Sequence, residues 1–182
     1  MRVVLGLAVW ALSLGMTYLV GDIAYSSDIN KYMDSTNLVG AYIIGSLVIA
    51  LVYSLWYILR KEQRILDIVG PVTVLLGWGL ARRKLLYAGG KGMVYSIAYD
   101  LKKVYGIKTG LIDLDYVSVS AVTEFVLFIV AVSMFFATYM IYRCNSLMIA
   151  IGLAFLFMLA GATLSVPVSA PGVVLTVLSL IV

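Results

Sequence analysis

The chain has 182 residues, of which 63% are hydrophobic and only 12% charged, and its formal net charge is +4 at neutral pH. Soluble domains carry about 25% charged residues, so this composition leaves too little polar surface to cover a water-soluble globule. We therefore expect an all-α, polytopic integral membrane helical bundle that forms one transmembrane domain over residues 1–182.

Two apolar runs open the chain, and an acidic stretch separates them. Residues 3–20 carry no charge and are about as long as one membrane span. Residues 38–59 supply a second span, which closes with Trp56 and Tyr57, whose rings favour the head-group level. Three aspartates and one lysine lie between the two runs, so we expect this connection outside and the amino terminus in the cytoplasm.

Residues 65–81 form an ambiguous element, because this apolar stretch contains Asp67 and Pro71 and has basic clusters on both sides. If it crossed the membrane, the seven basic residues between positions 82 and 108 would have to reach the outer face, which the positive-inside rule disfavours. We therefore expect a re-entrant or interfacial segment that is broken near Gly70 and Pro71 and covered by protein. A short span over the same residues is the alternative.

The next element is expected to be an amphipathic helix over residues 92–106, because apolar residues recur there at three- and four-residue spacing. Glycine stands at both ends of this stretch, and we expect residues 88–92 to form a flexible hinge before it. The expected apolar arc comprises Met93, Val94, Ile97, Ala98, Leu101, Val104 and Tyr105, and the polar arc comprises Ser96, Asp100, Lys102 and Lys103.

The same region supplies a basic platform that we expect on the cytoplasmic side, facing lipid or a partner subunit. The amphipathic helix either lies in the head-group layer with its lysines near anionic phosphates, or packs under its own bundle. The members of the platform are Arg82, Arg83, Lys84, Lys91, Lys102, Lys103 and Lys108.

Three further apolar runs complete the chain, over residues 117–142, 147–164 and 166–182. Pro167 and Pro171 stand where a connection between the last two antiparallel helices is needed. We therefore expect five transmembrane helices, with the carboxyl terminus outside. Six crossings, with residues 65–81 as the extra span, is the alternative.

Glu124 is the most informative single residue, because a carboxyl group inside a span is costly if it is ionised and faces lipid. Ser120 and Thr123 stand beside it in the sequence and make a local polar patch. One reading is a path for protons or cations. The other is a structural glutamate that joins two helices through an ion pair, to Arg2 or to a neighbouring subunit, and this reading is favoured because no second buried charge accompanies Glu124.

Asp67 is a second candidate polar residue, and it has two readings. Beside Gly70 and Pro71 it could line a re-entrant pore loop, since unwound backbone is tolerated where it lines a cavity. The ordinary reading, which we favour, is that Asp67 pairs with Arg60 or Arg64 at the head-group boundary.

The single cysteine, Cys144, and the absence of histidine exclude several kinds of site. One cysteine forms neither an intrachain disulfide nor a cysteine-based zinc or iron–sulfur site. Without histidine the chain builds neither a histidine-ligated haem nor a Ser-His-Asp triad. We therefore expect no enzyme, no catalytic residue, no metal and no cofactor other than lipid. The scarce amide side chains also fit a thermophile, although lipid-facing composition gives the same bias.

These observations favour a non-catalytic membrane subunit that packs within a larger assembly, as a homo- or hetero-oligomer, and presents the basic platform to anionic head groups. Small residues at four-residue spacing support close helix contact, within the chain or between chains, and the pairs are Ala41 with Gly45, Ser46 with Ala50, and Ala150 with Ala154. The alternative is a small proton or cation channel or transporter that uses Glu124. We expect no nucleic acid as a partner.

Overall fold

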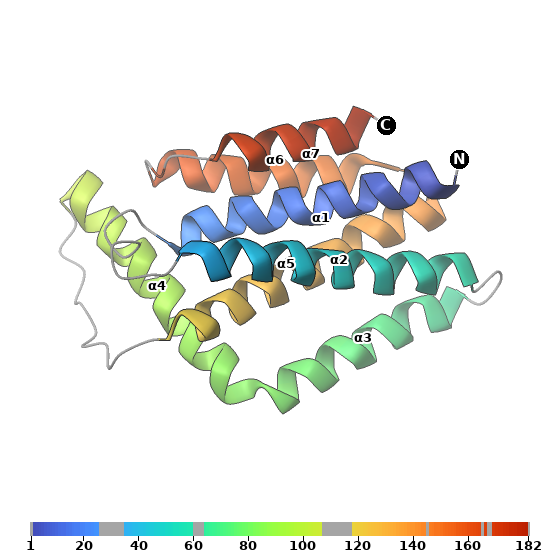
Figure 1. Ribbon diagram of the computed structural model, residues 1–182, viewed down its shortest axis with the longest axis horizontal. Coiled ribbons are helices and arrows are strands. Elements are labelled where there is room, and N and C mark those ends of the chain that lie inside the picture. The colour runs from blue at the N-terminus through green and yellow to red at the C-terminus, as the bar shows by residue number, and fades with distance from the viewer. Residues whose placement is uncertain are drawn as a thin grey trace.

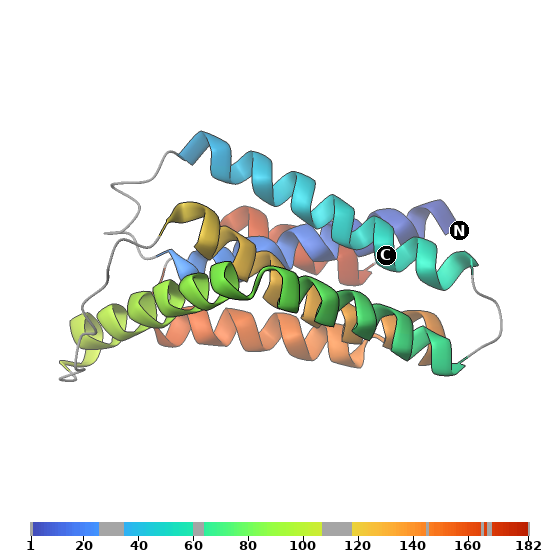
Figure 2. The same ribbon diagram turned by 90° about the horizontal axis from the view of Figure 1, so that it is seen from below.

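The computed structural model describes residues 2–25, 35–59, 64–106, 118–144, 146–164, 166 and 169–181, and every regular element in these ranges is a helix. All the helices except α4 run side by side along one long axis, and α4 lies obliquely at one end (Figures 1 and 2). We call this the α4 end, and the opposite end, where α1 begins and α7 finishes, the terminal end. The helices are α1 (Arg2–Ala24), α2 (Ser35–Leu59), α3 (Arg64–Ala81), α4 (Arg83–Tyr105), α5 (Val119–Cys144), α6 (Met148–Thr163) and α7 (Ala170–Ile181).

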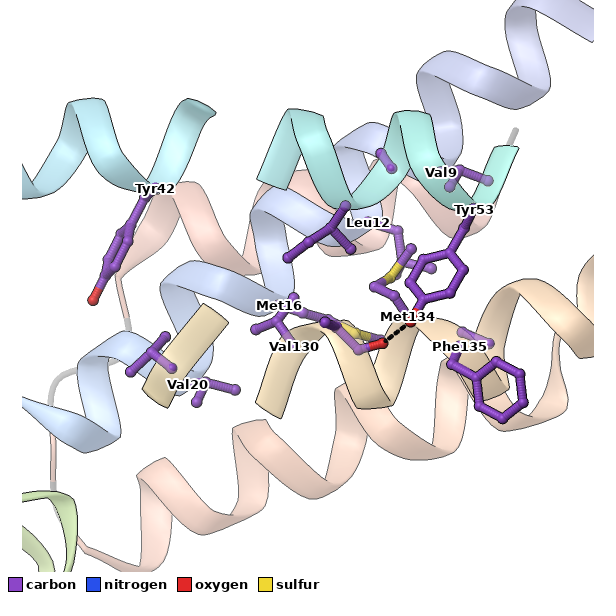
Figure 3. Close-up of a cluster of buried hydrophobic side chains, with 14 of the residues drawn as sticks. Val9, Leu12, Met16, Val20, Tyr42, Tyr53, Val130, Met134 and Phe135 are labelled. Atoms are coloured by element: carbon purple, nitrogen blue, oxygen red, sulfur yellow. Dashed lines mark hydrogen bonds between the residues drawn. The ribbon is translucent and has the colours of Figure 1, made fainter. Parts of the chain in front are cut away.

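α1 is the central helix of the bundle. Its residues Leu12 and Met16 are almost completely buried and lie with Tyr53 of α2 and Met134 of α5 in one apolar cluster (Figure 3). α7 approaches α1 at Gly15, where an added Cβ would lie 2.3 Å from the Thr176 hydroxyl oxygen. Small side chains therefore set the spacing of these helices, as in other membrane bundles.

Two of the small-residue pairs singled out in the sequence lie at helix contacts within this chain. Ser46 and Ala50 of α2 are buried, as are Ala150 and Ala154 of α6. The predicted helix-contact role of these pairs is therefore confirmed.

The outer surface of the bundle is apolar, and the mainly apolar interior also holds polar side chains, which differs from the polar exterior of a water-soluble protein. Ser13, Thr17 and Thr138 are fully buried. Exposed aliphatic and aromatic side chains cover the outer faces of α2, α3, α6 and α7, among them Ile44, Leu47, Leu76, Leu80, Phe155, Leu156, Leu178 and Ile181. This distribution agrees with the predicted helical membrane bundle, since lipid rather than water is then the surrounding solvent.

Among the described residues, three helical stretches are long and apolar enough to cross a membrane, namely Gly6–Ala24, Leu38–Tyr57 and Val119–Cys144. Asp67–Ala81, Met148–Thr163 and Ala170–Ile181 are shorter apolar helices.

α3 is one unbroken helix, so the predicted break at Gly70 and Pro71 is wrong. Proline has no N–H, and Pro71 therefore leaves the carbonyl of Asp67, four residues earlier, without its helical donor. The hydroxyl of Tyr57 on α2 donates to that carbonyl at 3.4 Å. Gly70 allows this approach, because an added Cβ there would lie 1.9 Å from the indole of Trp56. A neighbouring helix thus compensates for the lost backbone bond, and α3 continues through the proline.

Because α3 runs along the bundle, it leads the chain from the terminal end toward the α4 end (Figures 1 and 2). The start of α1 and the basic helix α4 therefore lie at opposite ends of the bundle. This differs from the prediction, which placed the amino terminus and the basic segment on the same side. The difference arises because the prediction treated residues 65–81 as a segment that returns to the side on which it enters.

α4 also differs from the predicted amphipathic helix in its length and in the face that it buries. It begins at Arg83 and passes through Gly89 and Gly90, so the predicted hinge at 88–92 is wrong. Its end at Gly106 agrees with the prediction, and this glycine has a φ of +65°, a left-handed conformation that favours glycine. The buried face consists of Leu86, Gly89, Gly92, Ser96 and Asp100.

The buried face of α4 thus contains Ser96 and Asp100 from the predicted polar arc, together with Leu86 and two glycines, while Lys102 and Lys103 are exposed. Gly89 is required there, because an added Cβ would lie 2.1 Å from the carbonyl oxygen of Ala121 on α5. Val94 and Tyr105, both from the predicted apolar arc, are 58% and 57% exposed. α4 therefore turns small and polar residues, with Leu86, toward the bundle and exposes its basic residues together with part of the predicted apolar arc.

The Tyr57 hydroxyl and Pro71 provide a test of how α3 stays continuous. We expect Tyr57→Phe to lower the free energy of unfolding by about 1–3 kcal/mol, because it leaves a buried carbonyl without a donor. In the Pro71→Ala background the same change is expected to cost much less, since alanine restores the backbone N–H. Denaturant titration in detergent micelles measures all four variants of this cycle.

Tyr53→Phe is the matched control. Tyr53 donates to the Ala131 carbonyl at 2.8 Å, and that carbonyl lies in the interior of α5, where it keeps its helical donor. The loss of unfolding free energy caused by Tyr53→Phe should therefore be the same with proline or alanine at position 71. Equal costs of Tyr57→Phe in both backgrounds would contradict our explanation of the unbroken helix.

Candidate functional site

Glu124 lies in the second turn of α5 and joins this helix to the junction between α3 and α4. Its Oε1 accepts a hydrogen bond from Trp78 Nε1 at 3.2 Å and lies 3.5 Å from Nε of Arg82. The Glu124 side chain is 19% exposed and that of Arg82 is 62% exposed. Of the two readings of Glu124, this geometry matches the ion pair between helices. The partner among the described side chains is Arg82, and the side chain of Arg2, named in the prediction, lies outside them.

Glu124 and Arg82 border a groove of about 750 Å³ between the start of α2, the end of α3 and the start of α5. Ser120 and Thr123 also line it, so three of the four predicted polar site residues lie together. The remaining lining residues are apolar apart from the Trp78 indole N–H, and include Leu38, Ala41, Val119 and Leu127.

The hydroxyls of the groove take part in local hydrogen bonds. Thr123 Oγ1 lies 2.7 Å from the Tyr25 hydroxyl, and Ser120 Oγ lies 3.1 Å from Ser118 Oγ. Burial raises the pKa of Tyr25, so its hydroxyl stays protonated at neutral pH and can act as a donor. Tyr25 ties the end of α1 to the start of α5 in this way. Sequence reasoning missed Tyr25, because no spacing relates it to Thr123.

Asp67, the fourth predicted polar residue, lies at the terminal end of α3, well away from the groove. Its carboxylate is fully buried and forms an ion pair with the guanidinium of Arg143 in the last turn of α5. The favoured prediction paired Asp67 with Arg60 or Arg64 at the head-group boundary; in the structure the Asp67 carboxylate is fully buried, and its partner among the described side chains is Arg143. Sequence reasoning missed it because Arg143 is far from Asp67 in the sequence and lies just beyond the predicted span over residues 117–142.

The two ion pairs attach α3 to α5 at both ends, and the signs of the Asp67–Arg143 pair fit the helix dipoles. Asp67 stands in the first turn of α3, where negative charge is favourable, and Arg143 stands in the last turn of α5, where positive charge is favourable. Glu124 lies in the second turn of α5, and Arg82 lies between α3 and α4. Between the pairs, Trp78 and Phe128 meet edge to face at 5.5 Å.

The basic platform is largely as predicted in exposure, although its surroundings differ. Arg82, Arg83, Lys84, Lys91, Lys102 and Lys103 are exposed, and Lys108 lies outside the described residues. The ammonium of Lys91 lies 4.9 Å from the centre of the Tyr87 ring, which is 68% exposed. The lysines Lys84, Lys91 and Lys102 thus share the outward side of α4 with apolar and aromatic side chains rather than forming a separate polar face.

No group of three or more Cys, Asp or Glu residues within the described ranges could hold a metal ion. The carboxylates of Asp67 and Glu124 are each engaged by a cationic side chain, and the two pairs lie at opposite ends of α3. The arrangement is suited to joining helices and to lining a groove. Comparisons of this chain with known protein families, curated proteins and solved structures found no match.

The Asp67–Arg143 pair supplies a stability prediction. We expect Arg143→Gln to lower the free energy of unfolding by about 3–5 kcal/mol, because it leaves the buried Asp67 carboxylate without its cationic partner. Adding Asp67→Asn should recover a large part of this loss, since the uncompensated charge is then removed. The free energies of unfolding of the single and the double variant can be measured in detergent micelles, with circular dichroism as the signal.

Arg83→Gln is the control, since it removes an exposed arginine, and we expect it to change stability by no more than about 0.5 kcal/mol. If the double variant were no more stable than Arg143→Gln alone, the pair would not be the reason for the loss.

Proposed function

We propose that this protein is a non-catalytic integral membrane subunit that packs within a larger assembly and presents the basic platform at the membrane surface. The observation that supports this proposal is that the candidate ionisable groups of the bundle are paired with cationic side chains. Asp67 and Glu124 are the ionisable groups expected to do chemistry inside the bundle, and each is engaged in an ion pair between α3 and α5. Charges used in this way fix the relative positions of helices, which is the role expected of them in a scaffold.

The proposed topology has six crossings, made by α1, α2, α3, α5, α6 and α7. Its support is the course of α3, which runs along the same axis as the other five and starts at the end opposite to α4. About 27 Å of helix in α3 falls slightly short of the hydrocarbon thickness, and the first turns of α4 extend it. In this arrangement both termini lie on the face opposite to α4.

The platform supports a cytoplasmic location for α4, because seven of the thirteen basic residues lie between positions 82 and 108. The outward side of α4 carries Tyr87 and Val94 beside Lys84 and Lys91. Such a mixture suits the head-group layer, where apolar groups enter lipid and ammonium groups reach phosphate. We propose anionic lipids and neighbouring membrane subunits as the partners of this surface.

One observation favours the alternative of a small proton or cation channel or transporter. Glu124 keeps part of its side chain exposed, and it faces a groove of about 750 Å³. A carboxylate at the mouth of such a groove could receive a cation. The direct contact with Arg82 opposes this reading, because a fixed positive charge repels the transported ion.

Glu124→Gln separates the two functions. If the protein is a subunit, Glu124→Gln removes the charge that holds the α3–α4 junction to α5. The assembly should then be weakened, and the variant should migrate as smaller species on a native gel. Proton and cation flux into liposomes should equal that of the unmodified protein.

Arg83→Gln is again the matched control, and it should change neither migration nor flux. An intact assembly that has lost a proton- or cation-driven flux on Glu124→Gln would reject the subunit reading and support transport.

A further inference from the structure

Beside the polar groove that Glu124 and Arg82 border, the structure contains a separate apolar pocket. The pocket has a volume of about 140 Å³ and lies between α2, α3 and α5, nearer the middle of the bundle. Val48, Val52 and Val74, which line it, are about half exposed, so it opens toward the surrounding lipid. Its other lining residues are Ile49, Tyr53, Trp56, Pro71, Leu75, Trp78 and Ala131.

Trp78 lines both the apolar pocket and the polar groove. Its ring packs against Phe128, while its N–H donates to Glu124. The indole therefore lies at the boundary between the apolar pocket and the charged groove. Tryptophan prefers such a boundary between apolar and polar surroundings in a membrane. The apolar pocket and the polar groove both lie between α2, α3 and α5 and share Trp78, and we call them together the α2–α3 cleft.

The mouth of this cleft carries one negative and one positive group side by side. The guanidinium of Arg82 is largely exposed and can bind a phosphate through two parallel N–H donors. The partly exposed carboxylate of Glu124 can accept hydrogen bonds from an ammonium group. A purely anionic head group would satisfy Arg82 but place its charge beside Glu124, which disfavours it.

From this geometry we propose that the α2–α3 cleft binds a phospholipid whose head group carries both a phosphate and a primary amine. One hydrocarbon chain occupies the apolar pocket, the phosphate lies on Arg82 and the ammonium lies on Glu124. The proposal rests on the proposed function in one respect, because it requires the cleft to face lipid. It adds a defined site and a defined class of lipid.

Tryptophan fluorescence can test the site on the full chain. In a Trp10→Phe/Trp56→Phe background, Trp78 is the remaining reporter. The protein is reconstituted in vesicles in which a fixed fraction of lipid has brominated chains, and that fraction carries either a phosphoethanolamine or a phosphocholine head group. Phosphocholine has no N–H, so it cannot donate to Glu124.

We expect the brominated phosphoethanolamine lipid to quench Trp78 with an apparent affinity about fivefold higher, which corresponds to one additional hydrogen bond. Ala41→Phe narrows the groove without touching the ion pair and should remove this preference. Ala162→Phe makes the same change at an exposed position on α6 and should retain it. Glu124→Gln should reduce the preference.

Equal quenching by both head groups, or a preference that survives Ala41→Phe, would overturn the lipid site while leaving the membrane location intact. No quenching by either lipid would overturn the lipid-facing cleft together with the membrane location on which it depends. The two failures are therefore distinguishable.

Discussion

The attachment of α3 to α5 at both ends is the constraint on which the arrangement depends. α3 exposes much of its surface to the surroundings, including Leu76 and Leu80, and its buried charge is matched by Arg143. Ion pairs taken out of water contribute little net stability when they can be replaced by apolar packing, but breaking one is costly. The pairs at Asp67 and Glu124 therefore specify where α3 lies more than they strengthen the bundle.

Lipid as the solvent explains the other main features of the fold. The hydroxyls of Ser13, Thr17 and Thr138 turn inward, while aliphatic side chains cover the outside. Thr17 and Thr138 bond to carbonyls of their own helices, and Ser13 donates to the Ser46 carbonyl on α2 at 3.2 Å. The same logic accounts for α4, whose glycine, serine and aspartate residues face the bundle. It also accounts for Tyr57, which replaces the donor that Pro71 lacks.

Composition and hydropathy were sufficient to predict a helical membrane bundle, because long apolar runs have few other stable forms. They also placed Glu124 with Ser120 and Thr123, since these residues are close in sequence. The course of residues 65–81 could not be predicted in the same way. Pro71 and the flanking basic residues are local signals of a break. The features that oppose it, the Tyr57 hydroxyl and the Arg143 guanidinium, come from other helices. The buried face of α4 was missed for a related reason, since periodicity identifies two faces but not which one meets the bundle.

The most direct test of the account asks whether α3 carries the chain from one face of the membrane to the other. Single cysteines introduced by Lys61→Cys, just before α3, and Lys84→Cys, just after it, can be labelled in sealed vesicles with a membrane-impermeant maleimide after Cys144 is replaced by serine. The account predicts that the two positions react from opposite faces. Labelling of both from the same face would contradict it, because α3 would then return to the side from which it started.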